Sequence, residues 1–183
     1  MNFKATGLDG SWLIGPERKR DDRGFFVRTF CEREFAEKSL ESRFVQTSLS
    51  YNKTKGTLRG LHFQLPPHEE VKIVGCIKGA ICDVIVDLRA ASPTFGKWRA
   101  YLLSEENGCQ IYIPKGFGHG YQTLTDEAMV SYAISEFYAP DSASGIRFDD
   151  PQLGIDWPLQ PSVISDRDCS WGNLEGRLIA LGE

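Results

Sequence analysis

The sequence contains no long apolar run. None of the hydrophobic segments in its 183 residues approaches the roughly 20 residues that a membrane-spanning helix needs. The first seven residues show no basic stretch followed by an apolar one, so no secretory signal is expected. A chain of this length with 41% hydrophobic residues can bury one substantial core. We therefore expect a cytoplasmic protein with a single domain and no membrane partner.

Several motifs of common function classes are also missing. The five cysteines form an odd set without a C-x-x-C pair, which is typical of reduced thiols and not of a disulfide framework or a zinc site. The net charge of -4 argues against nucleic acid as a partner, because phosphate neutralisation needs clustered Lys and Arg. No βαβ alternation and no glycine-rich phosphate loop are present, which excludes a Rossmann dehydrogenase. The cysteines are Cys31, Cys76, Cys82, Cys109 and Cys169.

What the sequence does contain is a series of short alternating runs between about Leu58 and Ile134. Turn residues separate these runs, and this pattern predicts an all-β antiparallel sandwich or barrel. Only Glu32–Leu40 is expected to be helical. The expected strands are Leu58–Gln64, Val71–Cys76, Ala80–Leu88, Trp98–Leu103, Gln110–Ile113 and Ala128–Ile134.

One of these strands carries two carboxylates on an otherwise apolar face. Side chains two apart share a face, so Asp83 and Asp87 lie on the side of Ile81 and Ile85. Two interpretations stay open for Asp83. It either caps a turn or pairs with an arginine at the barrel rim, or it points into a polar cavity and orients a histidine.

The chain has only three histidines, His62, His68 and His119. His68 lies in a polar loop and is expected to be exposed. The spacing P-x-G-x-x-H that ends at His119 resembles the second motif of the cupin superfamily. Metal-binding cupins also have an H-x-H in their first motif, where this chain has His62-Phe63-Gln64. A metal-free cupin is therefore expected, and a metal-dependent cupin dioxygenase or isomerase is disfavoured.

Several further segments, in order along the chain, resemble the dTDP-4-dehydrorhamnose 3,5-epimerase family. The resemblance runs from about Leu13 to Asp168. It implies a cupin-type jelly roll that dimerises through exchanged N-terminal strands and uses no metal or redox cofactor. N-terminal strands and a short helix would occupy about 1–45, the barrel about 46–140 and a C-terminal segment 141–183. The matching segments are 59–64, 71–74, 83–89, 92–96, 113–120 and 149–151.

The resemblance also implies a reaction and its residues. The family epimerises carbon 3, carbon 5 or both in a nucleotide-linked 4-keto-6-deoxyhexose, whose protons beside the ketone are acidic. Inversion needs a base on one face and an acid on the other. His62 matches the base, Asp168 the aspartate that orients it, Tyr132 the acid, and Lys72 the cation near the enolate oxygen. Asp166 is the alternative to Asp168. Taken singly, Tyr132 would be a core aromatic, Lys72 a surface charge and Asp168 a turn residue; together with His62 they supply every role that the reaction needs.

Nucleotide recognition follows the family less closely. Arg23 matches a diphosphate-binding arginine, and Phe26 and Tyr138 are candidate stacking surfaces for the base. Arg28 stands where a glutamate is usual, and an arginine can donate to the bare acceptors of cytosine, so this position favours a CDP-linked sugar while the base, thymine or cytosine, stays open. Ala143 and the segment 46–51 also depart from the family pattern. Further candidates for this part of the site are Gln46, Arg59, His119 and Arg167.

Three other functions remain to be compared with a two-carbon epimerase. A cupin that only binds a sugar nucleotide would have lost one of the catalytic positions, yet all four are present. A sugar-nucleotide ketoisomerase would shift the ketone instead of inverting its neighbours. A single-carbon epimerase that acts on a CDP-linked sugar would keep the same base and acid.

Overall fold

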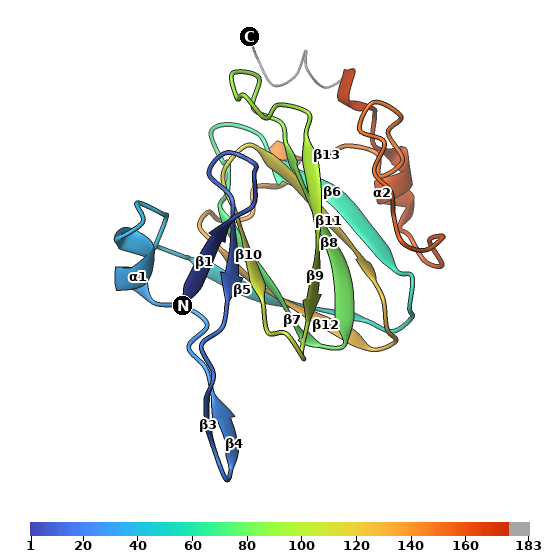
Figure 1. The fold of residues 1–183 in the computed structure, drawn as a ribbon. Helices are drawn as coiled ribbons and strands as arrows, with labels where there is room; N and C mark the ends of the chain where they lie inside the picture. The colour runs from blue at the N-terminus through green and yellow to red at the C-terminus, as the bar shows by residue number, and fades with distance from the viewer. Residues whose placement is uncertain (176–183) are drawn as a thin grey trace.

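The computed structural model describes residues 1–175 and consists mainly of two antiparallel β-sheets packed face to face (Figure 1). The larger sheet has the order β1-β2-β10-β7-β12-β5, and the smaller has the order β13-β6-β11-β8-β9. This arrangement confirms the prediction of an all-β, cupin-type jelly roll. The larger sheet comprises β1 (Asn2–Ala5), β2 (Trp12–Gly15), β10 (Gln110–Ile113), β7 (Lys72–Lys78), β12 (Ala128–Ile134) and β5 (Gln46–Asn52). The smaller comprises β13 (Ala143–Gly145), β6 (Leu58–Gln64), β11 (Phe117–Thr123), β8 (Ala80–Asp87) and β9 (Trp98–Ser104).

Three strands have the bounds that the alternation predicts, namely β6, β10 and β12, and β7, β8 and β9 differ only at their ends. The pattern did not reveal β5 or β11. Every residue of β11 is buried, so the strand has no polar face to alternate with an apolar one. In β5 the inward positions carry small polar side chains such as Ser50, which hides its apolar period.

The core lies between the two sheets. The inward side chains of β7, β8, β10, β11 and β12 form one apolar cluster that includes Val74, Ile85, Ile111 and Val130, all fully buried. Two buried polar side chains, Asp83 and His119, lie on β8 and β11 among these apolar residues. The structure therefore holds its polar groups on a rigid, well-packed frame.

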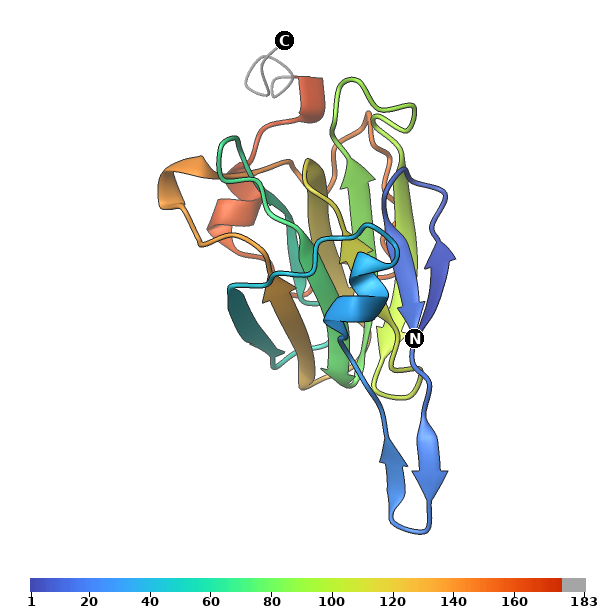
Figure 2. The same cartoon turned by 90° about the vertical axis from the view of Figure 1, so that its left-hand side faces the viewer.

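Short helices and a hairpin lie outside the two sheets of the described chain (Figures 1 and 2). Helix α1 (Glu32–Ala36) is shorter than the predicted Glu32–Leu40, and its Phe35 is buried against the outer face of the larger sheet. The hairpin of β3 (Lys19–Asp21) and β4 (Gly24–Phe26) projects away from the body. A short 3-10 helix, η1 (Pro140–Ser142), precedes β13, and α2 (Asp166–Ser170) lies beside β6. No helix within residues 1–175 is long and apolar enough to cross a membrane.

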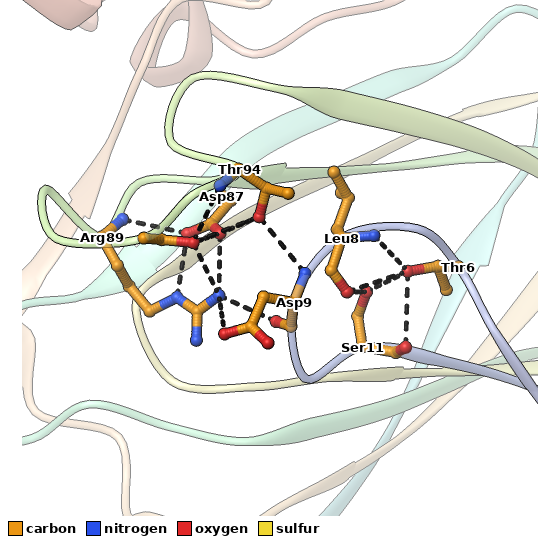
Figure 3. Close-up of polar contacts among 8 residues, drawn as sticks. Thr6, Leu8, Asp9, Ser11, Asp87, Arg89 and Thr94 are labelled. Carbon is orange, nitrogen blue, oxygen red and sulfur yellow. Dashed lines mark hydrogen bonds and ion pairs between the residues drawn. The ribbon is translucent and has the colours of Figure 1, made fainter.

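A buried carboxylate ties the N-terminal loop to the end of β8 (Figure 3). Asp87 is fully buried and accepts hydrogen bonds from Arg89, Ser92 and Thr94. Arg89 in turn donates to the backbone oxygen of Asp9 at 2.8 Å. Burial alone raises the pKa of Asp87, but these hydrogen bonds outweigh it and hold the pKa below its ordinary value. Of the two carboxylates on β8, Asp87 is therefore the one that pairs with an arginine at the barrel rim.

Next to this network the chain turns between β1 and β2. The Thr6 hydroxyl accepts from the Leu8 backbone N–H and contacts the Ser11 hydroxyl, while Ser11 donates to the Leu8 carbonyl (Figure 3). These bonds satisfy the polar groups of a turn whose Leu8 and Ser11 side chains are buried.

Candidate active site

Two neighbouring strands bring two histidines together on the inner face of the smaller sheet. His62 on β6 and His119 on β11 are direct partners in the antiparallel register. The strands approach closely where Gly60 meets Gly120, because a Cβ on Gly60 would lie only 2.5 Å from the Gly120 Cα. Gly60 also has a φ of +129°, a conformation that other residues rarely adopt. Local backbone geometry thus places both imidazoles in the barrel.

His62 is paired with Asp168 at the mouth of the barrel. Its Nε2 lies 2.6 Å from Asp168 Oδ1, and the Gly60 N–H donates to Asp168 Oδ2 at 3.2 Å. Ser165 caps α2 by accepting from the Asp168 N–H, which fixes the aspartate. Asp168, and not the exposed Asp166, is therefore the partner of His62.

The charge state of Asp168 decides which imidazole nitrogen is free. Burial raises the pKa of this carboxyl. The hydrogen bonds from His62 and the backbone lower it by more, so the pKa lies below its ordinary value. An ionised carboxylate only accepts hydrogen bonds, so the proton of His62 is on Nε2. Nδ1 then carries the lone pair, and the side chain of His62 is 42% exposed. This is the arrangement of a general base.

His119 makes a second histidine–aspartate pair deeper in the barrel. Its Nε2 lies 2.8 Å from Asp83 Oδ2, and both side chains are buried. Of the two interpretations of Asp83, the structure shows the one in which it holds a histidine. Within residues 1–175 the other oxygen of Asp83 has no hydrogen-bond partner. The His119 ring lies 6.1 Å from the Tyr132 ring and 6.3 Å from the Tyr121 ring.

Tyr132 faces the barrel interior from β12 and packs against the core cluster. Its pKa is raised well above the ordinary value, first by burial and then by the neighbouring Tyr121 and Asp83. The phenol therefore keeps its proton at neutral pH. A protonated hydroxyl beside His119, the strand partner of His62, can serve as a proton donor.

Lys72 begins β7 and is 7% exposed. Its Nζ lies 2.7 Å from Glu70 Oε1 and 3.4 Å from the His62 carbonyl oxygen. The ammonium group is thus fixed close to the candidate base. Glu70 is a site residue that the sequence did not indicate, because its run Pro66–Glu70 has the composition of an exposed loop.

A cavity of about 310 Å³ opens beside His62 and Asp168. Of the predicted nucleotide-binding residues, Arg59, Tyr138 and Arg167 line it, and Gln46 accepts a 2.8 Å hydrogen bond from the Tyr138 N–H. His119 does not line this cavity and is 4% exposed. The remaining lining residues are Phe63, Gln64, Glu70, Ala143, Ser144 and Ser165.

The other predicted nucleotide-binding residues lie elsewhere. Arg23 and Phe26 are on the projecting hairpin, where the Arg23 side chain is 90% exposed and forms an ion pair with Asp21. Arg28 follows the hairpin and forms a 3.2 Å ion pair with Glu34. The predicted nucleotide-binding residues thus lie in two places, at the cavity and on or next to the projecting hairpin of β3 and β4.

Neither the thiols nor any cluster of metal-ligating side chains forms a second candidate site in the part of the chain that the structure describes. All five cysteines are unpaired, and burial raises the pKa of Cys76 and Cys82 to about 11, so these thiols stay protonated. No group of three or more His, Cys, Asp or Glu side chains in residues 1–175 is placed to hold a metal ion.

Known proteins resemble this chain over almost its whole length. Residues 5–176 match the family model for dTDP-4-dehydrorhamnose 3,5-epimerase. A relative of that name from Methanothermobacter thermautotrophicus is 47% identical, covering 99% of this chain and 98% of the relative. A dTDP-4-dehydrorhamnose 3-epimerase from Streptomyces niveus is 38% identical, covering 92% of this chain and 81% of its own. A structure of a 3,5-epimerase from Legionella pneumophila, in complex with dTDP-4-keto-L-rhamnose, has a TM-score of 0.90 at 40% identity, covering 95% and 93%.

Proposed function

Because the chain belongs to the dTDP-4-dehydrorhamnose 3,5-epimerase family, we propose that it inverts carbons 3 and 5 of a dTDP-linked 4-keto-6-deoxyhexose. The observation that carries this proposal is the His62–Asp168 pair, which opens on the cavity with a free imidazole nitrogen. The enzyme would act as an isomerase in deoxysugar biosynthesis and needs no cofactor for proton transfer. Its unpaired cysteines suit the reducing cytoplasm.

The first step is removal of a proton from a carbon beside the ketone. His62 Nδ1 takes this proton, and Asp168 stabilises the imidazolium that forms. The electron pair of the broken C–H bond moves into the ring as an enolate, with its negative charge on the carbonyl oxygen. The short contact between His62 and Asp168 supports this assignment because it sets both the tautomer and the ring orientation.

The enolate oxygen is stabilised by a fixed positive charge. Lys72 fills this role, since its ammonium group lies 3.4 Å from the His62 carbonyl oxygen and is enclosed by protein. Glu70 holds the side chain at 2.7 Å and limits its rotation. A group that is ordered before the reaction loses no further entropy when charge develops.

Inversion is completed by a proton from the opposite face of the sugar ring. Tyr132 donates it, because burial and its neighbours keep the phenol protonated. Water or bulk solvent then restores the proton to Tyr132 and removes the one held by His62. The same pair of groups serves carbon 5 and carbon 3 once the ring presents each carbon in turn.

The nucleotide occupies the outer part of the site. Arg59 and Arg167 bind the diphosphate, and Tyr138 provides a flat surface for the base. A cavity of about 310 Å³ lies at the small end of the range of roughly 300–1,000 Å³ for ligand pockets. A complete sugar nucleotide therefore needs additional surface.

That additional surface comes from a second copy of the chain. The exposed hairpin carries Arg23 and Phe26 away from the body, with 69% of Phe26 exposed. In a homodimer with exchanged N-terminal strands, this arm reaches the cavity of the partner. The outer face of the larger sheet supports the same dimer, because Leu49, Tyr51 and Ile77 are each at least 50% exposed there.

The activity is tested by incubating the protein with dTDP-4-keto-6-deoxy-D-glucose and following the configuration of carbons 3 and 5 by NMR. We expect inversion at both. Inversion at carbon 3 alone would identify a single-carbon epimerase, and a shifted ketone would identify a ketoisomerase. The CDP-linked analogue is run in parallel, and faster turnover of it would assign the base recognised beside Arg28 to cytosine.

The shared site is tested by complementation. Arg23→Ala and His62→Asn should each reduce activity, but in a mixed dimer one site has both an intact His62 and an intact Arg23 arm. Co-expression of the two variants should therefore restore roughly a quarter of wild-type activity, given random pairing of the subunits. Sedimentation should show a dimer for each variant. No recovery in verified mixed dimers would contradict the exchange.

A further inference from the structure

A buried amide lies behind the cavity, at the end of β5. Asn52 is 2% exposed, and its Nδ2 donates to the backbone oxygens of Ser50 and Ala128, both at 3.3 Å. Because both donors go to carbonyl oxygens, the amide can be placed in only one of its two orientations. Its oxygen therefore points to the other side, where only donors can be accommodated.

Two side chains donate to this one oxygen. The Arg59 Nε lies 2.9 Å from Asn52 Oδ1, and the Tyr121 hydroxyl lies 3.2 Å from it. Within residues 1–175 the two terminal nitrogens of Arg59 have no protein partner, and Arg59 lines the cavity. The guanidinium group is thus held by its inner nitrogen, and its two outer nitrogens remain available for a ligand.

The second donor, Tyr121, lies in the barrel interior near Tyr132. Tyr121 has one hydroxyl proton and gives it to Asn52, so toward Ser50, 2.9 Å away, its oxygen accepts. Tyr121 is also a neighbour of Tyr132 and helps to raise its pKa. One amide oxygen therefore holds both an arginine at the cavity and a tyrosine that neighbours the proposed proton donor.

We propose that Asn52 is a positioning residue that orients Arg59 for a bidentate contact with the diphosphate of the substrate. This inference rests on the proposed function, because it takes a nucleoside diphosphate sugar as the ligand. An arginine on a strand has several rotamers, and a hydrogen bond at Nε restricts them before the substrate arrives. Asn52 touches no substrate atom and acts only through Arg59.

The test is a double-mutant cycle on the binding of dTDP, measured by isothermal titration calorimetry. Arg59→Ala should weaken binding about 10- to 100-fold, as expected for the loss of a charge-assisted contact, and Asn52→Ala about 5- to 10-fold. If Asn52 acts through Arg59, the double variant should bind within about 2-fold of Arg59→Ala. A double variant weakened by the product of the two losses would overturn the proposal, as would wild-type affinity in Asn52→Ala.

A matched control uses the other donor to the same oxygen. Tyr121→Phe removes a hydrogen bond from Asn52 without touching Arg59, so dTDP binding should stay within about 2-fold while kcat falls. An equal loss of dTDP affinity in this variant would mean that the network acts as a whole and would contradict a specific role through Arg59. If Asn52→Ala does not fold, Asn52→Ser takes its place, because its hydroxyl can still donate to a backbone carbonyl but is too short to hold Arg59.

Failure of the proposed function has a different signature. In that case the wild-type protein would bind neither dTDP nor CDP, and no cycle could be measured. Wild-type binding that is weakened by Arg59→Ala but unaffected by Asn52→Ala would leave the function standing and remove only the role of Asn52.

Discussion

The barrel contains two histidine–aspartate pairs whose surroundings differ. His62–Asp168 lies at the mouth, with 42% of the His62 side chain exposed, whereas His119–Asp83 lies inside, with 5% of the His119 side chain exposed. The two hydrogen bonds have similar lengths, 2.6 and 2.8 Å. Access, and not the pairing itself, therefore separates the proposed base from a histidine that is enclosed by its neighbours.

The two aspartates also differ in how fully they are satisfied. Asp168 accepts hydrogen bonds from His62 and from the Gly60 N–H, and it lies in a capped helix. By contrast, one oxygen of Asp83 has no hydrogen-bond partner within residues 1–175. A buried polar atom without a partner costs stability, and such costs are tolerated where function requires the group. The inner pair is therefore expected to matter for both stability and the placement of Tyr132.

The largest expected effect follows from removal of the outer histidine. His62→Asn should lower kcat about 10²- to 10⁴-fold, the range typical of a lost general base, in an NMR assay of epimerisation. His68→Asn is the matched control, because His68 is exposed in a loop and its replacement should leave kcat unchanged. A kcat for His62→Asn within a few-fold of wild type would assign the base elsewhere.

Asp168→Asn is expected to have the next largest effect. Loss of the carboxylate removes the partner that fixes the His62 tautomer, so kcat should fall on the order of 10²-fold. Asp166→Asn, two residues away and exposed, should not change kcat. Equal losses in the two variants would show that α2 as a whole is being disturbed.

Replacement of Asp83, the inner aspartate, should lower the stability of the fold more than it lowers kcat. In Asp83→Asn an amide group must occupy a fully buried site, where its extra donors find no partner, so the free energy of unfolding should drop by about 1–3 kcal/mol. Because the proposed base is His62 and not His119, kcat should fall less than in Asp168→Asn. Urea unfolding and kcat, measured on the same samples, check this. A larger loss of kcat than in Asp168→Asn would reverse the assignment of the two pairs.

Asp87 offers a third buried carboxylate with no role in the site, and it should affect kcat least. Its pKa is lowered, so it stabilises the fold above the pKa of the unfolded chain, and this stability is lost as the pH falls through the lower folded pKa. Asp87→Asn should therefore reduce the free energy of unfolding at pH 7 but leave kcat within about 2-fold. The stability difference from wild type should shrink below about pH 4, close to the ordinary pKa of an aspartate. A difference that is constant with pH would exclude this linkage.

The strands that sequence patterns predict are those with one apolar and one polar face. β6, β10 and β12 have the expected bounds, while β11 was missed because both of its faces are buried, although it carries His119. Helix α1 ends at Ala36 and not at Leu40, because Ser39 has a φ of +56°, which a helix does not allow. Local periodicity thus predicted the frame but not the strand that completes the site.

Long-range pairs within the site could not be read from local sequence. His62 and Asp168 are 106 residues apart, and only the resemblance to a known family placed them together. Asn52 and Glu70 carry no motif, and their roles follow from contacts made across strands and to neighbouring loops. Their identification required the structure, because hydrogen-bond geometry is not encoded in residue spacing.

The most direct measurement of the central claim is deuterium incorporation from heavy water into the sugar, located by NMR. The wild-type enzyme should introduce deuterium at carbons 3 and 5 with inversion, and Tyr132→Phe should still exchange protons while inversion slows. His62→Asn, with Asp83 and His119 intact, should do neither. Deuterium exchange at the wild-type rate in His62→Asn would contradict the assignment of His62 as the base.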